Sequence, residues 1–197
     1  MMSIIDFFFD YGSPTSYLAY VQMPGVAKRT GATINYKPFL LGGVYQATQN
    51  RSPMEIPAKR DWMLEDMKFF AKRYGVAFQF NPHFPINTLH LMRGAMYAQR
   101  EGFLVPYSDA IFKAMWVDAK NLGDVAVIAQ TLKDAGLDGR RIIEATQEPA
   151  VKDSLKAATE EASKRGLFGA PTVFVGSQMF FGQDRVQFVE ELVAATR

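Results

Sequence analysis

Short apolar segments near the two ends of the chain are separated by a long stretch of helical periodicity. Residues 4–9 form an apolar and aromatic run interrupted only by Asp6, which predicts a buried strand. Residues 32–39 alternate well enough to predict a second strand. Two more strands are expected at 173–175 and 178–181, joined by a two-residue hairpin turn.

The segments between these strands carry helix signals. A helix is expected to begin at Pro14, with a kink or interruption at Pro24-Gly25 and an end at Gly31. A loop is expected from residue 40 to about residue 57, followed by a long helix up to Tyr74. Further helices are predicted to start at Asn87 or Thr88, Pro106, Asp124, Asp138 and Pro149, with a last one capped by Gly182-Gln183-Asp184.

The order of elements predicts an α/β fold, a four-stranded mixed sheet (βαβ…ββα) with a large all-helical insertion. The first two strands should be parallel because a helix connects them. Residues 1–40 and 167–197 must close into one domain, since neither part can bury a core by itself. Residues 41–166 are expected to form a helical insertion domain over its active face.

Composition narrows the classes of function. The chain has 197 residues, a formal net charge of +2 and no basic run, so we expect no nucleic-acid partner. Its apolar runs are too short for a bilayer, and the first strand begins directly after Met1, so neither a membrane span nor a signal peptide is expected. There is no cysteine, which favours a cytoplasmic location.

Ser13 lies where the first strand ends and the first helix begins. With Pro14 in the first helical position, Ser13 is the expected N-cap, and a helix start favours an adjacent anion. Thioredoxin-like proteins carry Cys-x-x-Cys at such a junction, but here the four residues are Ser13-Pro14-Thr15-Ser16. Disulfide exchange is therefore impossible. Ser13 is either a helix cap alone or a group that stabilises a bound anion.

Two other positions could contribute to a site beside Ser13. Ala170-Pro171 enters the third strand, where a cis peptide bond would turn the backbone N–H and C=O of Ala170 towards the Ser13 helix start. These groups could then pair with a peptide-like ligand. Asp184 is either an N-cap or a ligand for an amine, and the residues alone favour the cap.

Other kinds of site find little support in the sequence. His83 and His90 lack metal-ligand spacing, so no metal site is expected. No phosphate-binding glycine motif and no Gly-x-Ser-x-Gly motif is present. Aromatic side chains in predicted loops could line a pocket, namely those of Tyr11, Phe39, Phe84 and Phe168.

Several motifs resemble one known family. The segment from Gly12 to Leu18 resembles the N-terminal serine motif of 2-hydroxychromene-2-carboxylate isomerases and kappa-class glutathione transferases, in the DsbA-like branch of the thioredoxin superfamily. Residues 168–172 resemble the family's cis-proline loop, and residues 181–185 its last helix start. Further matches lie at Asn50, Pro57-Ala58-Lys59, Asn87-Thr88-Leu89 and Arg93-Gly94-Ala95. They span nearly the whole chain and imply a thioredoxin-like fold with a cis Ala170–Pro171 bond.

This resemblance implies a cofactor and a set of ligands. Glutathione would supply the thiol that the protein lacks, and Ser13 would stabilise its thiolate. Ala170, beside Pro171, would pair with the glutathione backbone, while Gln183 and Asp184 would hold the γ-glutamyl end. Asn50 and Lys59 would bind the glycyl carboxylate or the substrate. Asn87 is expected on the substrate side, together with the four aromatic residues.

The resemblance also implies a reaction. Glutathione thiolate would add to the conjugated double bond of 2-hydroxychromene-2-carboxylate, the ring would open, and bond rotation and thiolate loss would give trans-o-hydroxybenzylidenepyruvate, a step of aromatic hydrocarbon catabolism. Two alternatives remain: a kappa-class-like glutathione transferase that conjugates electrophiles, and a non-catalytic thioredoxin-like binding module. Apolar helices left over in the insertion predict a homodimer.

Overall fold

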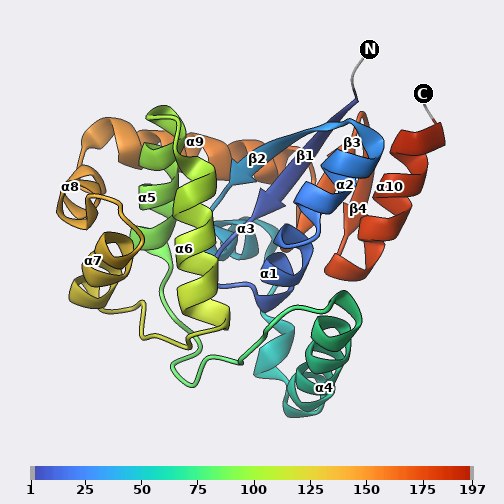
Figure 1. Cartoon of the computed structure of the whole chain (residues 1–197), viewed down its shortest axis with the longest axis horizontal. Coiled ribbons are helices and arrows are strands. Elements are labelled where there is room, and N and C mark those ends of the chain that lie inside the picture. The colour runs from blue at the N-terminus through green and yellow to red at the C-terminus, as the bar shows by residue number, and fades with distance from the viewer. Residues whose placement is uncertain (1–2, 196–197) are drawn as a thin grey trace.

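A four-stranded mixed sheet lies at the centre of the protein, whose computed structural model describes residues 3–195 (Figure 1). Its strands are β1 (Ile4–Phe9), β2 (Thr33–Pro38), β3 (Thr172–Val175) and β4 (Gln178–Phe181), in the order β2-β1-β3-β4. β1 pairs with β2 in parallel, whereas β3 is antiparallel to both β1 and β4. The predicted strands, the parallel pair and the hairpin are confirmed.

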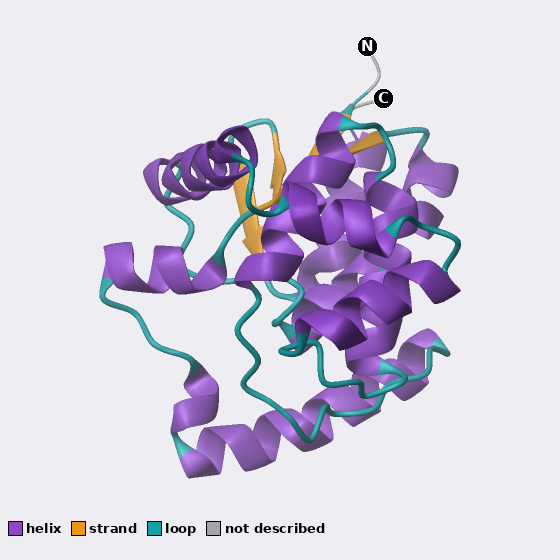
Figure 2. Ribbon diagram, turned by 90° about the vertical axis from the view of Figure 1, so that its left-hand side faces the viewer, coloured by secondary structure: helices purple, strands orange, loops and turns teal. Residues whose placement is uncertain are grey.

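The helices cover both faces of this sheet (Figures 1 and 2). The predicted interruption of the first helix is confirmed, because Pro24 lies in the first turn of a separate second helix. The helices are α1 (Pro14–Tyr20), α2 (Met23–Thr30), α3 (Leu41–Thr48), α4 (Pro57–Tyr74), α5 (Leu89–Arg100), α6 (Leu104–Trp116), α7 (Val125–Asp134), α8 (Gly139–Ala145), α9 (Pro149–Lys164) and α10 (Val186–Ala195), with 3-10 turns at Pro53–Glu55 and Gln183–Arg185.

The loop expected over residues 40–57 is wrong in part, because α3 and a 3-10 turn occupy most of it. Two glycines in the first turn conceal the helix signal in the sequence. The start of α3 is satisfied by distant groups: Leu41 N–H donates to Asp10 Oδ2 at 2.8 Å, and Leu40 N–H donates to Thr159 Oγ1 at 3.0 Å. Because these partners are distant in the sequence, no neighbouring capping residue indicates the start of this helix.

Two other helix starts differ from expectation. The helix expected to start at Pro106 begins two residues earlier, at Leu104. Asp184 is not the N-cap of the last helix, because it lies inside the 3-10 turn that precedes α10, with Gly182 at the cap position of that turn. Asp184 instead lies 3.3 Å from the Arg185 guanidinium.

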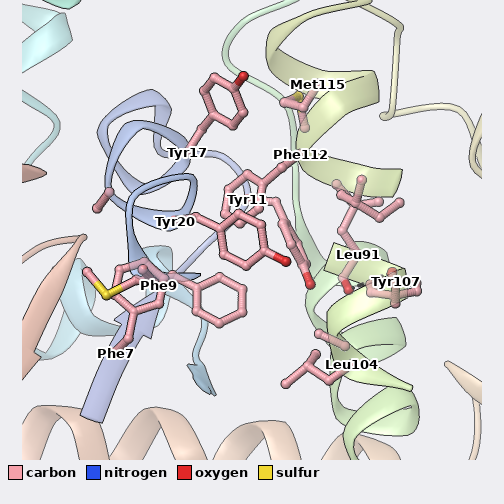
Figure 3. Close-up of a cluster of buried hydrophobic side chains, with 14 of the residues drawn as sticks. Phe7, Phe9, Tyr11, Tyr17, Tyr20, Leu91, Leu104, Tyr107, Phe112 and Met115 are labelled. Atoms are coloured by element: carbon pink, nitrogen blue, oxygen red, sulfur yellow. Dashed lines mark hydrogen bonds between the residues drawn. The ribbon is translucent and has the colours of Figure 1, made fainter. Parts of the chain in front are cut away.

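β1 supplies the centre of the hydrophobic core. Ile5, Phe7 and Phe9 lie on one face of the sheet and Phe8 on the other, and all four are buried. The first face joins α1, α2, α5 and α6 in a hydrophobic cluster, in which Phe9 contacts Phe112 of α6 with ring centroids 5.7 Å apart (Figure 3). Phe8 packs with residues of α3 and α9 on the second face. Because the core runs across the predicted boundary at residue 40, the division into two domains stays a prediction.

The close approach of α5 and α6 depends on Gly94. A Cβ atom there would overlap the Tyr107 hydroxyl, which donates to Leu91 O at 2.9 Å (Figure 3). We predict that Gly94→Ala lowers the free energy of unfolding by about 1–3 kcal/mol, the usual cost of overpacking a core. Chemical denaturation would measure this.

A double-mutant cycle tests the cause. In a Tyr107→Phe background the overlapping oxygen is gone, so Gly94→Ala should cost less than in the wild type. Gly42→Ala, in α3, is the matched control, because apart from its own helix turn the added Cβ would meet no atom of the described chain within 4 Å. It should be neutral or stabilising by about 0.5–1 kcal/mol. Equal costs of Gly94→Ala in both backgrounds would contradict the explanation.

Candidate active site

A cavity of about 430 Å³ opens beside the start of α1. Ser13 and Thr15 line it from α1, and Ala170 lines it from the segment before β3. The start of α3 and the cis Phe84–Pro85 segment form other parts of the wall. This is the carboxyl end of the parallel strands β1 and β2, where ligands bind in open α/β sheets.

Ser13 makes the cap that the sequence predicted and a second contact besides. Its Oγ accepts from Ser16 N–H at 3.1 Å and donates to Ala170 O at 2.9 Å. Thr15 Oγ1 lies 3.0 Å from Ser13 Oγ and also donates to Ala170 O, at 3.3 Å. Ala170 O therefore has two hydroxyl partners, so one of them can turn to a ligand without leaving that carbonyl unpaired.

The Ala170–Pro171 bond is cis, as predicted. The backbone of Ala170 faces the start of α1, since its carbonyl accepts from Ser13. That carbonyl is already bonded, so the Ala170 N–H is the group left for a peptide-like ligand within the described chain. The contact joins residues 157 positions apart in the sequence.

The cavity wall also contains a buried carboxylate, that of Asp10, which was not predicted from the sequence. It is 1% exposed. Oδ1 accepts from Gly12 N–H at 2.8 Å, while Oδ2 accepts from Leu41 N–H at 2.8 Å and from the Thr88 hydroxyl at 3.2 Å. Burial raises the pKa of Asp10, and the three hydrogen bonds oppose that rise. The position of Asp10, directly after the predicted first strand, could have indicated a polar residue at the edge of the sheet. Nothing in the sequence identified its distant hydrogen-bond partners.

Tyr45 is a second cavity residue that the sequence did not indicate. It lies in α3, in the segment expected to be a loop. Burial raises the pKa of its phenol, and the nearby charges of Asp10 and Glu55 raise it further. Tyr45 therefore stays protonated at neutral pH and offers the cavity a hydroxyl donor.

The four predicted pocket aromatics separate into three groups. Phe84 lines the cavity. Tyr11 and Phe39 do not, because both are fully buried in the core, where Tyr11 bonds the Ser108 hydroxyl at 2.7 Å. Phe168 lies outside the wall and packs against Phe181, with ring centroids 4.6 Å apart. A loop position in the sequence does not distinguish a pocket residue from one that packs back into the core.

Most of the predicted polar ligands do not line the cavity. Asn87 lines the wall, although its side chain already accepts from the N–H of Leu89, the first residue of α5, at 3.0 Å. Asn50 donates to Phe168 O at 2.8 Å and thus joins two loops. Lys59, in the first turn of α4, is exposed. Gln183 is buried and accepts from the Tyr74 hydroxyl.

Among residues 3–195, no group of three or more His, Cys, Asp or Glu side chains is placed to hold a metal ion. None of the helices in the same range combines the length and apolar character of a membrane span.

The sheet order, the cis-proline segment and the Ser13 helix start define a thioredoxin-like protein. Residues 4–194 match the family model of the DSBA-like thioredoxin domain. By that match, and by 33% identity to 2-hydroxychromene-2-carboxylate isomerase of Sphingobium xenophagum over 96% of this chain and 97% of that one, the chain belongs to the 2-hydroxychromene-2-carboxylate isomerase family of DsbA-like proteins. This confirms the family expected from the motifs.

Other comparisons agree with that assignment. A solved structure of 2-hydroxychromene-2-carboxylate isomerase superposes with a TM-score of 0.89 at 28% identity, covering 98% of this chain and 95% of that one. Glutathione S-transferase kappa 1 of Homo sapiens is 24% identical over 96% of this chain and 90% of its own.

The partners of Asp10 give a testable consequence. Asp10→Ala would leave the N–H groups of Gly12 and Leu41 without their acceptor, so we predict a loss of about 2–4 kcal/mol in the free energy of unfolding. Chemical denaturation measures this. Asp124→Ala is the control, since it removes an exposed cap of α7 and should cost about 1 kcal/mol.

The loss should depend on pH. The folded protein keeps the proton of Asp10 to a higher pH than the unfolded chain, whose aspartate titrates near 3.8. The stabilising contribution of Asp10 is thus complete below that pH and declines as pH rises through the folded pKa. The difference between wild type and Asp10→Ala should be larger near pH 4 than at neutral pH. A difference that grows with pH would contradict the raised pKa.

Proposed function

We propose that this protein is a glutathione-dependent isomerase that interconverts 2-hydroxychromene-2-carboxylate and trans-o-hydroxybenzylidenepyruvate. The observation that carries the proposal is the cavity-facing hydroxyl of Ser13, bonded to Ala170 O, in a member of this family whose sequence has no cysteine. Any thiol chemistry in this cavity must therefore come from a bound cofactor. The proposed substrate is a small aromatic acid, matched to a cavity of about 430 Å³.

The proposed ligands match the chemical groups of a thiol tripeptide. Ala170 N–H is a backbone donor of the kind that pairs with an extended peptide. Asp184, whose side chain is 39% exposed, offers a carboxylate for an ammonium group. Lys59 offers a cation for a carboxylate. When bound, glutathione supplies a soft sulfur nucleophile.

The residues of this chain prepare the cavity for that sulfur. The Ser13 hydroxyl can rotate from Ala170 O towards an anion, because Thr15 remains hydrogen-bonded to the same carbonyl. α1 has only seven residues, so the hydroxyl rather than the helix dipole is the main stabilising group. Asp10 fixes the backbone at Gly12, directly before Ser13. Tyr45 is a neutral donor for an oxygen of the substrate.

A kappa-class-like transferase is the second candidate, favoured by the matches to kappa transferases of Homo sapiens and Caenorhabditis elegans. Turnover of 2-hydroxychromene-2-carboxylate against that of 1-chloro-2,4-dinitrobenzene separates the two activities. Retention on immobilised glutathione separates both from a non-catalytic module.

Two further properties are part of the proposal. A homodimer is supported by large apolar side chains left exposed on α4, where Trp62 is 66% and Phe69 is 59% exposed. Light scattering at micromolar concentration would test it, and a monomeric mass would contradict it. A cytoplasmic location rests on the absence of cysteine.

Ser13→Ala tests the role of the hydroxyl. Activity in the wild type should require added glutathione. The substitution should raise the pKa of the bound thiol and reduce turnover at neutral pH by about a hundredfold, the effect of losing one donor to a developing anion. Raising the pH should restore part of the rate, because the thiolate then forms without help.

Steady-state kinetics over a range of pH would measure this, with Ser16→Ala as the matched control. Ser16 is buried, and its hydroxyl has no hydrogen-bond partner in the described chain. Turnover by the wild type without glutathione, or full activity of Ser13→Ala at neutral pH, would refute the mechanism.

Asp184→Asn tests the site for the γ-glutamyl amine. Asp184 is not a helix cap, so the substitution leaves the cap of the last helix unchanged. If Asp184 holds the ammonium group, Asp184→Asn should weaken glutathione binding by about 1–3 kcal/mol in calorimetry. Asp61→Asn, on the exposed side of α4, should leave the affinity unchanged. Equal affinities of the wild type and Asp184→Asn would exclude this role.

A further inference from the structure

A second cavity, of about 510 Å³, lies on the other side of α3 from Ser13. α3, the start of α5 and α9 form its walls. Leu89 and Leu155 contribute apolar surface, and Leu40 lines both cavities. The second cavity shares no other residue with the Ser13 cavity, so it is a separate compartment.

Positive charge is concentrated around this apolar surface. Four of the lining side chains are cationic and one, Glu160, is anionic, which leaves an excess of three positive charges (4 − 1). The whole chain has a net charge of only +2. The carboxylate of Glu160 lies 4.0 Å from Lys156, so it neutralises at most one of the cations. The four cations are Arg93, Lys152, Lys156 and Lys164.

Arg93 is the member of this group that most needs a partner. Its Nε is buried, and within residues 3–195 no acceptor bonds to it. Arg165, an arginine of similar burial, is satisfied: it pairs with Asp6 at 2.7 Å and lies 4.0 Å from the centroid of Phe174. A buried guanidinium nitrogen without an acceptor is costly, and an incoming carboxylate would satisfy it with a charge-assisted hydrogen bond.

We propose that this cavity binds a small organic anion, a monocarboxylate with an apolar body. Arg93 bonds the carboxylate, Lys152 and Lys164 add attraction at the rim, and the leucines take up the apolar body. An apolar lining with few convergent charged groups is the usual composition of a small-molecule site. The proposal does not depend on the reaction proposed for the Ser13 cavity.

Isothermal titration of the full chain with 4-phenylbutanoate tests the site, with 4-phenylbutanamide as the neutral counterpart. We expect the acid to bind at least about tenfold more tightly than the amide, and more weakly at high salt. Arg93→Gln should weaken binding of the acid about tenfold. Lys28→Gln, on the exposed side of α2, and Ser13→Ala, in the other cavity, should leave it unchanged.

If Arg93→Gln does not fold, the double variant Lys152→Gln/Lys164→Gln replaces it in the titration. It should also weaken binding of the acid. The proposal would be overturned if the acid did not bind, or if acid and amide bound with equal affinity. It would also be overturned if Ser13→Ala lost binding of the acid while Arg93→Gln retained it. The last result would place the acid in the Ser13 cavity.

Discussion

The buried carboxylate of Asp10 organises the surroundings of Ser13. Its two oxygens hold the turn before α1, the first residue of α3 and the threonine that precedes α5. These three segments belong to different parts of the chain, and each forms part of one cavity wall. Burying a carboxylate is costly, which is why the pKa of Asp10 rises. The hydrogen bonds offset this cost by satisfying N–H groups that the helix start and the turn would otherwise leave unpaired.

The sequence predicted the elements whose signals are local. The buried β1, the interruption at Pro24-Gly25 and the caps at Asp124 and Asp138 depend on neighbouring residues, and the structure shows all of them. α3 was missed because its start is held by Asp10 and Thr159, neither of which is near it in the sequence. The predicted cap at Asp184 is wrong because a 3-10 turn, which contains Asp184, comes before α10.

The candidate site was predictable to the same extent. Ser13 and the cis Ala170–Pro171 segment lie together because motif and topology both place them at the end of β1. Which aromatic side chains reach the cavity depends on how the inserted helices pack, and periodicity carries no information about that. Tyr11 therefore lies among core side chains, whereas Tyr45, hidden in an unrecognised helix, lies at the cavity.

The hydrogen bond from Ser13 to Ala170 can form only late in the synthesis of the chain. Its donor follows the first strand, and its acceptor is made only after all the helices of residues 41–166. The inserted helices can begin to pack while the Ser13 hydroxyl still lacks this partner. A truncated product that ends before residue 167 would keep the serine and most of the helices but would have no assembled site. Incomplete chains are therefore expected to be inactive, however much helix they contain.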